Sequence, residues 1–279
     1  MTVHLTTSDL LARGTALLAP VLEWPSLDAA ILLAFSLGVA RVRLKSHPEE
    51  SRTAQDLERY LAVIERRARG EPVAYITGVR EFWTLELRVT RDVLVPRPET
   101  ELLVERALVL GPKAAAQVLD LGTGSGAIAL ALAAERPEWR LLAIDASAAA
   151  LAVAQDNARR LGLANVIFES GHWFSGLGAR RFDLVVSNPP YVDARDPALL
   201  ALKHEPRQAL TPGEDALADL RAIIHAAPEH LQVGGWLSLE HGATQAAAVA
   251  HELVARGFGS VRSHRDLGGH DRVTEGQWT

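Results

Sequence analysis

Residues 187 to 192 read SNPPYV and follow an apolar run, FDLVV, that is typical of a buried strand. Two consecutive prolines cannot continue a strand, so the chain must turn at this corner. The side-chain oxygen of Asn188 and the carbonyl of Pro189 can together accept both hydrogens of one NH2 group, and Tyr191 can pack against a flat substituent. The corner is therefore predicted to hold a planar group that carries an NH2, such as an amide or an adenine edge.

A second motif, VLDLGTGSGAIAL, places a glycine-rich loop between an expected strand and an expected helix. Glycines allow a sharp turn close to a ligand, and the helix behind the loop offers unpaired N–H groups to an anion. The G-x-G-x-G spacing differs from the dinucleotide fingerprint and no Walker lysine follows, which favours a carboxylate over a pyrophosphate. The residues predicted to contact the ligand are Gly122, Thr123, Gly124, Ser125 and Gly126.

Asp145 ends the next expected strand, about 20 residues beyond the loop, where a ribose-binding acid is usual. A carboxylate there can accept hydrogen bonds from both ribose hydroxyls. The loop and Asp145 together predict a nucleoside-type ligand; a structural turn followed by a surface aspartate is the alternative. Ligands of open α/β sheets bind outside the carboxyl ends of the strands. Asn188 would therefore face this ligand if FDLVV lies beside QVLDLG.

The elements that must position these residues are strands and helices in alternation from about residue 117, the pattern of a parallel sheet flanked by helices. Residues 1–70 are predicted to form a small helical domain, with Ser8 and Ser26 as N-caps. Residues 71–99 contain FWTLELRVT, whose alternation indicates a hairpin, followed by two prolines. We take this segment as a linker to an α/β domain over residues 100–279.

Composition narrows the class of protein. The formal net charge of the 279 residues is −5. The sequence contains no cysteine, so disulfides, thiolate metal sites and cysteine nucleophiles are excluded. The first residues lack the pattern of a signal peptide, and the most apolar stretch, AAILLAF, is too short to span a bilayer. The histidines show no metal-ligand spacing. A cytoplasmic protein without a metal site is predicted.

Five segments together resemble the HemK/PrmC family of methyltransferases over nearly the whole chain: GEPVAYITGVREFWTLELRVTRDVLVPRPETELLVE, VLDLGTGSGAIALAL, VVSNPPYV, EPRQALTPGEDAL and DLGGHDRVTEGQW. The resemblance implies a Rossmann-like class I methyltransferase domain, a helical substrate-recognition domain and a hairpin linker. It also implies S-adenosyl-L-methionine as cofactor. The implied reaction is methylation of the side-chain nitrogen (N5) of the glutamine in the Gly-Gly-Gln motif of class 1 peptide chain release factors.

The same resemblance implies roles for individual residues. The loop from Gly122 to Gly126, Asp145 and Asn188 bind the cofactor, and Trp173 packs at its adenine. The substrate glutamine is held by Asn188, Pro189, Pro190 and Tyr191, of which Asn188, Pro189 and Tyr191 are catalytic. The family commonly has an acidic residue before the tryptophan, but His172 stands there and is left out of the predicted site. Arg97 could face the substrate entrance or have only a surface role.

Three other functions are compatible with the corner: glutamine methylation of a ribosomal protein, adenine-N6 methylation of nucleic acid, and nucleoside binding without catalysis. The acidic net charge and the lack of an evident basic, aromatic-rich domain argue against direct nucleic-acid binding. The intact Asn188–Tyr191 corner argues against a mere binding module. Nothing at the corner separates the protein substrates, so the N-terminal domain must do so. The expected partners are release factors, without nucleic acid or membrane.

Overall fold

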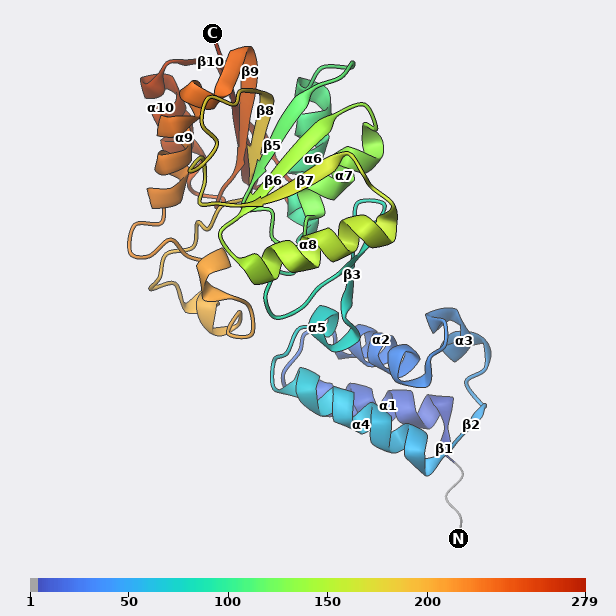
Figure 1. Cartoon of the computed structure of the whole chain (residues 1–279). Helices are drawn as coiled ribbons and strands as arrows, with labels where there is room; N and C mark the ends of the chain where they lie inside the picture. The colour runs from blue at the N-terminus through green and yellow to red at the C-terminus, as the bar shows by residue number, and fades with distance from the viewer. Residues whose placement is uncertain (1–4) are drawn as a thin grey trace. The chain divides into compact units, whose positions relative to one another are not determined.

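The computed structural model describes residues 5–279 and divides into two compact units, one ending at Val79 and the other spanning Arg80–Thr279 (Figure 1). The division falls inside the first strand of the hairpin, so most of the segment predicted as a linker groups with the larger unit. The functional boundaries 1–70, 71–99 and 100–279 stay a prediction. Among the described residues, no helix is both long enough and apolar enough to cross a bilayer.

The smaller unit is helical, and two of its helices begin at threonines with reciprocal capping. Thr6 accepts a hydrogen bond from Asp9 N at 3.2 Å, while the Asp9 carboxylate accepts one from Thr6 N at 2.9 Å. The elements of the unit are β1 (Leu5–Thr6), α1 (Thr7–Leu18), α2 (Pro25–Leu37), α3 (Arg41–Ser46), β2 (Ser51–Arg52), α4 (Ala54–Ala68) and α5 (Val73–Thr77).

The predicted N-caps are wrong at both positions. Thr6 caps α1, because Asp9 three residues later completes a capping box that Ser8 cannot form from inside the helix. Helix α2 begins at Pro25, whose fixed φ suits the first helical position, and Ser26 follows it within the helix.

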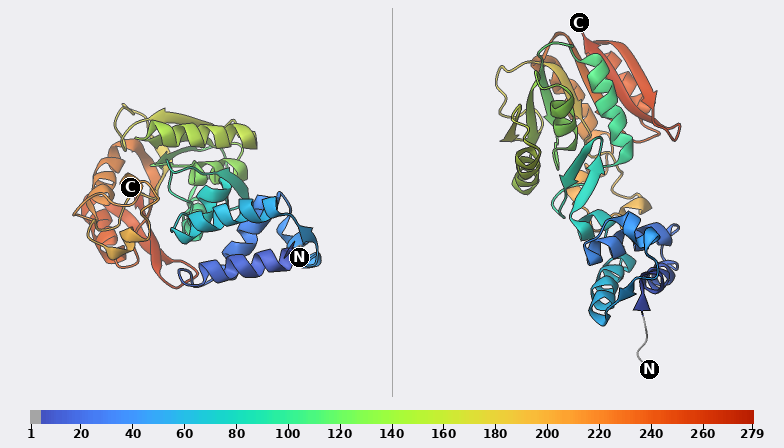
Figure 2. Two further views of the ribbon diagram at one scale, coloured as in Figure 1. Left: turned by 90° about the horizontal axis from the view of Figure 1, so that it is seen from below. Right: turned by 90° about the vertical axis from the view of Figure 1, so that its right-hand side faces the viewer.

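The larger unit is built on a seven-stranded sheet in the order β10-β11-β9-β8-β5-β6-β7. The five strands from β9 to β7 are parallel, and β11 and β10 add an antiparallel pair at one edge. Figure 2 shows this red pair at the edge opposite the yellow-green β7. The strands are β5 (Gln117–Leu121), β6 (Arg140–Asp145), β7 (Val166–Ser170), β8 (Phe182–Ser187), β9 (Leu231–Glu240), β10 (Phe258–Arg265) and β11 (Asp271–Trp278).

Helices cover both faces of the sheet, so the predicted α/β fold, a largely parallel sheet flanked by helices, is confirmed. Successive strand residues point to opposite faces, so Val118 joins one hydrophobic cluster with α6 and α7, while Leu119 joins another with α9 and α10. The helices are α6 (Glu101–Leu110), α7 (Ala127–Glu135), α8 (Ala148–Leu161), α9 (Ala218–His230) and α10 (Ala246–Arg256), with short 3-10 turns η1 (Pro98–Thr100), η2 (Pro197–Leu200) and η3 (Arg207–Ala209).

The hairpin of β3 (Val79–Phe82) and β4 (Leu85–Arg88) is fastened to the larger unit at both ends. At its turn, Trp83 N donates to Glu101 Oε1 and Trp83 Nε1 donates to Glu135 Oε1, each at 2.8 Å. At the end of β4, the buried Asn157 of α8 accepts from Arg88 N at 2.7 Å and donates to Arg88 O at 3.0 Å. The same Nδ2 reaches the glycine loop through Ser125 O at 2.9 Å.

Strand order and register bring the predicted site residues to one edge of the sheet. Strand β5 lies between β6 and β8, and Leu121 is paired with Ile144 on one side and Ser187 on the other. The residues that follow Leu121, Ile144 and Ser187 in the sequence are Gly122, Asp145 and Asn188, so these three lie at the same edge of the sheet. The segment FDLVV therefore lies beside QVLDLG, as the predicted approach of Asn188 to the glycine loop requires.

Candidate active site

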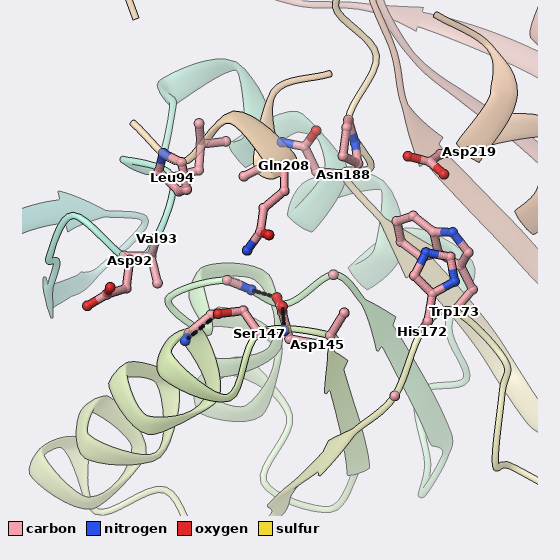
Figure 3. A pocket seen from close by; sticks show the side chains of 18 residues that line it. Asp92, Val93, Leu94, Asp145, Ser147, His172, Trp173, Asn188, Gln208 and Asp219 are labelled. Carbon is pink, nitrogen blue, oxygen red and sulfur yellow. Dashed lines mark hydrogen bonds between the residues drawn. The ribbon is translucent and has the colours of Figure 1, made fainter. Parts of the chain in front are cut away.

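A cavity of about 260 Å³ opens at the carboxyl ends of these strands (Figure 3). Six of the predicted site residues line it: Gly122, Gly124, Asp145, Trp173, Asn188 and Pro190. The wall is completed by residues from five other stretches, namely Asp92 to Leu94, then Ala146, Ser147 and Ala150, then Gly171 and His172, then Pro206, Gln208 and Ala209, and finally Asp219. All of them belong to the larger unit.

The other three residues of the glycine loop lie behind its cavity face. Thr123 N donates to Ile144 O at 3.0 Å, and its hydroxyl donates to the buried Asp120 Oδ2 at 2.7 Å. Gly126 has a φ of 84°, and a Cβ placed there would lie 2.9 Å from Leu130 Cδ1. Thr123, Ser125 and Gly126 thus shape the loop that presents Gly122 and Gly124, and contact of these three with a cofactor stays a prediction.

Asp145 is held in a single orientation by two backbone donors. Its Oδ2 accepts from Gly124 N at 2.9 Å, and its Oδ1 accepts from Ser147 N at 2.8 Å. Each carboxylate oxygen can accept more than one hydrogen bond, so both keep acceptor capacity toward the cavity. Ser147 in turn caps α8 by accepting from Ala150 N at 3.2 Å. The carboxylate is thereby placed to receive a pair of hydroxyl groups.

Trp173 and His172 form one end of the cavity together with Asp219, which α9 contributes (Figure 3). The Trp173 ring packs over Gly122, where an added Cβ would lie 3.4 Å from Cζ3. The ring centroids of His172 and Trp173 are 5.1 Å apart. Burial raises the pKa of Asp219, although Trp173 and His172 act in the opposite direction. Sequence reasoning left His172 aside and missed Asp219, which no local motif marks.

The proline corner is braced from outside the motif. Asn188 Nδ2 donates to Thr100 Oγ1 at 3.1 Å, which leaves the side-chain oxygen of Asn188 for the cavity. Tyr191 does not line the cavity; its hydroxyl donates to Glu240 Oε1 at 3.1 Å. Its carbonyl accepts from Gln245 Nε2 at 3.0 Å. The segment EHGATQ, which contains Glu240 and Gln245, therefore holds the corner in place.

Two buried carboxyl groups near the site have perturbed acidity. Burial raises the pKa of Glu240 to about 7, while the Thr100 and Tyr191 hydroxyls and the charge of Arg272 act against that rise. Burial also raises the pKa of Asp120 to about 7, against the hydrogen bond from Thr123. Neither carboxyl group lines the cavity, so each acts through the residues that it holds.

Arg97 is paired within the larger unit. It donates to Glu205 Oε1, and the other oxygen of this buried carboxylate accepts from Val95 N at 3.0 Å. Glu205 begins the EPRQAL segment, which supplies Pro206, Gln208 and Ala209 to the cavity wall. In Figure 3 the amide of Gln208 points into the cavity between Asn188 and Asp145. The sequence pattern did not predict that EPRQAL lines the cavity, although this segment contributes to the family resemblance.

The cavity residues suit a nucleoside that carries a charged tail. Asp145 offers fixed acceptors for ribose hydroxyls, the indole of Trp173 offers a flat surface, and Gly124 leaves open space where a side chain would stand. Asp219 adds an acceptor at the tryptophan end. The residues present therefore fit S-adenosylmethionine.

Two domain families match the sequence. Residues 9–78 match the PrmC N-terminal domain, and residues 98–269 match the methyltransferase small domain. Among solved structures, a methyltransferase from Pyrococcus furiosus has a TM-score of 0.54 at 17% identity, covering 69% of this chain and 88% of that one. A T. thermophilus 16S rRNA methyltransferase in complex with AdoMet and guanosine has a TM-score of 0.53 at 21% identity, covering 72% and 50%. These likenesses establish the class I methyltransferase fold.

Full-length relatives are more similar. A release factor glutamine methyltransferase from Pseudomonas aeruginosa is 51% identical over 254 residues, covering 90% of this chain and 92% of the relative. Those from Coxiella burnetii and Yersinia pestis are 45% and 48% identical, each covering more than 90% of both chains. The resemblance to the HemK/PrmC family is confirmed. With both domain matches, these relatives show that the chain belongs to the release factor glutamine methyltransferase family.

Proposed function

We propose that this chain transfers a methyl group from S-adenosyl-L-methionine to the side-chain amide nitrogen (N5) of the glutamine in the Gly-Gly-Gln motif of class 1 peptide chain release factors. One observation carries the proposal. Asn188 and Pro190 of the proline corner line the same cavity as Gly122, Gly124 and Asp145. An acceptor for an NH2 group is thereby combined with a nucleoside-binding loop in one site.

Bound S-adenosyl-L-methionine supplies the methyl group on an electrophilic sulfonium. The acceptor is a poor nucleophile, because amide resonance delocalises the nitrogen lone pair and gives the C–N bond a rotation barrier of about 18–20 kcal/mol. The task of the protein is therefore to orient the amide. The Asn188 side-chain oxygen and the Pro189 carbonyl accept the two hydrogens of the substrate NH2, which fixes the direction of its lone pair.

Orientation of this kind can lower a barrier by about 7–11 kcal/mol when the reacting groups are well aligned. The two acceptors also bind more strongly in the transition state, because positive charge develops on the nitrogen that they contact. The alkylated amide nitrogen is strongly acidic, so no general base has to act before methyl transfer. Tyr191, held by Glu240 outside the cavity wall, keeps the corner rigid.

For the cofactor we propose Asp145 at the ribose, the loop from Gly122 to Gly126 at the amino-acid tail, and Trp173 at the adenine. Supporting contacts are the two backbone hydrogen bonds that orient the Asp145 carboxylate and the packing of Trp173 on Gly122. We propose that the helical unit recognises the release factor, without nucleic acid or membrane as partners. Release factors act in the cytoplasm, which is the location that this proposal implies.

A labelled-methyl transfer assay tests the proposal with competing acceptors. Purified release factor, its variant with glutamine replaced by alanine in the Gly-Gly-Gln motif, ribosomes and DNA are each offered with labelled S-adenosylmethionine. We expect label in the intact release factor alone, and peptide mass spectrometry should place it on that glutamine. Label in a ribosomal protein or in DNA, with none in the release factor, would replace the proposal by the corresponding alternative.

A further inference from the structure

One side of the cavity lies across from Asp145 and is built from two stretches of chain, which we call the outer wall. The first stretch follows the hairpin and the second belongs to EPRQAL; together they supply Asp92, Val93, Leu94, Pro206, Gln208 and Ala209. Figure 3 shows Leu94 and Gln208 across the cavity from Asp145. Neither stretch belongs to the sheet or to an α-helix. Contacts outside regular secondary structure must therefore hold the outer wall in place.

The carboxylate of Glu205 joins the two stretches. Its Oε2 accepts from Val95 N at 3.0 Å, and Val95 directly follows the first stretch. Its Oε1 accepts from the guanidinium of Arg97. Glu205 itself directly precedes Pro206, the first residue of the second stretch. A single side chain thus ties the two halves of the outer wall together, next to the cavity on both sides.

The burial of Glu205 indicates that this link is a built feature of the fold. Its side chain is only 2% exposed, whereas that of Arg97 is 33% exposed. A buried carboxylate is costly unless hydrogen bonds and an opposite charge compensate it, and both oxygens of Glu205 have a partner. Neither Glu205 nor Arg97 lines the cavity. The pair therefore acts on a ligand through the outer wall and not by contact.

The proline corner is held by other contacts. Asn188 donates to Thr100, which is followed directly by α6, and the carbonyl of Tyr191 accepts from Gln245. The Glu205 carboxylate takes part in neither hydrogen bond. Loss of this carboxylate should therefore loosen the outer wall while the amide-binding corner stays in place. The expected consequence is a change in cofactor binding with little change in the methyl-transfer step.

We propose that Glu205 is a positioning residue for the cofactor: its carboxylate fastens the outer wall, which keeps S-adenosylmethionine enclosed beside the proline corner. Arg97 serves in the same task as the partner of this carboxylate. The inference rests on the cofactor of the proposed function and adds the device that retains it. Since affinity differences between closely related complexes arise mostly in the dissociation rate, a loosened wall should release the cofactor faster.

The test compares the wild type with Glu205→Gln in binding S-adenosylhomocysteine, the demethylated cofactor. Glutamine keeps the size of the side chain, and its oxygen can still accept from Val95 N, but its NH2 group would then face the donors of Arg97. The dissociation constant, from calorimetry, and the dissociation rate, from a chase with unlabelled ligand, should each rise about tenfold, the scale of one lost charge-assisted hydrogen bond. With both substrates saturating, kcat should change less than about threefold.

Two results would overturn the inference: a Glu205→Gln variant that binds the ligand as tightly as the wild type, or a tenfold fall in kcat with binding unchanged. If Glu205→Gln does not fold, the double variant Arg97→Met/Glu205→Gln takes its place, because it leaves no unpaired buried charge. The same rise in dissociation constant and rate is expected there, and binding like that of the wild type would again overturn the inference.

Hydrogen exchange separates a loosened wall from a general loss of stability. In Glu205→Gln the backbone amides of residues 92–97 and 206–211 should exchange faster than in the wild type, while those of β5 should keep their protection. An equal acceleration in β5 and in the outer wall would overturn the inference, because the variant would then have destabilised the whole unit.

Glu275→Gln is the matched control. The side chain of Glu275 is likewise 2% exposed and pairs with Arg106 at 3.0 Å, and neither residue lines the cavity. This variant should lower the melting temperature yet leave the dissociation constant and rate unchanged. An equal loss of affinity in Glu275→Gln would overturn the special role of Glu205. A wild-type protein that binds S-adenosylhomocysteine but leaves the release factor unmethylated would refute the proposed acceptor, while a tenfold weaker Glu205→Gln would still support the inference.

Discussion

Asn188 donates its side-chain amide hydrogen to Thr100 Oγ1 over 3.1 Å, although the two residues are 88 positions apart. The contact joins the end of β8 to the turn η1 that precedes α6. The two halves of the Asn188 amide therefore differ in their partners. The NH2 group donates to the protein, and the oxygen is free to accept a hydrogen bond in the cavity. The prolines that follow cannot donate from their backbone nitrogens, so Pro189 offers only its carbonyl.

Replacing Asn188 by alanine should separate chemistry from cofactor binding. We expect kcat to fall about 100-fold or more, as when a preorganised transition-state contact is removed, with the S-adenosylmethionine dissociation constant nearly intact. Single-turnover assays and calorimetry measure the two quantities. Asn165→Ala is the matched control, because Asn165 bonds only to backbone carbonyls beyond the cavity and should affect stability alone. Parallel losses of turnover and cofactor affinity in Asn188→Ala would contradict the assigned role.

Replacing Asp145 by alanine should weaken the binding of S-adenosylmethionine. Two charge-assisted hydrogen bonds to ribose hydroxyls are expected to disappear, so the dissociation constant should rise about tenfold or more. The control is Asp156→Ala on α8, whose carboxylate pairs with Arg88 on the surface and should leave the constant unchanged. Unaltered cofactor affinity in Asp145→Ala would rule out the ribose contact.

Replacing Gly126 by alanine should destabilise the glycine loop. The backbone there has a φ of 84°, and the new Cβ would meet Leu130 Cδ1 at 2.9 Å. Gly162→Ala is the comparison, since its φ of 69° is similar but no atom lies within 4 Å of the added Cβ. Both variants should lose about 1 kcal/mol through the strained backbone. Urea unfolding should show a further loss for Gly126→Ala only, and equal losses would show that the clash relaxes without cost.

The unfolding free energy should depend on pH through Asp120. Burial raises its pKa from 3.8 to about 7, so between these values the folded protein holds a proton that the unfolded chain has released. Stability from this group is therefore complete below about pH 4 and is lost as the pH rises toward about 7. The unfolding free energy, measured by urea titration between about pH 5 and about pH 8, should depend less on pH in Asp120→Asn than in the wild type. Identical pH profiles would show that Asp120 is ionised throughout this range.

The sequence by itself determined the class of fold and the kind of ligand. A strand, a glycine loop and a helix follow one another within 18 residues of QVLDLGTGSGAIALALAA, and the proline corner directly follows its strand. Such features are local, since the backbone conformation of each residue depends on its near neighbours. Even local reasoning failed where two signals competed, as at Ser8, because the Thr6–Asp9 pair forms a complete capping box with its N-cap two residues earlier.

Only the tertiary structure decided how the site is supported. Thr100, Glu205, Asp219 and Glu240 lie in four separate segments, and none carries a motif that points to the others. Strand order places the end of β9 beside that of β8, so that Glu240 reaches Tyr191, while the Arg97–Glu205 pair fixes the wall that carries Gln208. These contacts join residues far apart in sequence. They depend on the packing of the whole sheet, and no short stretch of the chain encodes them.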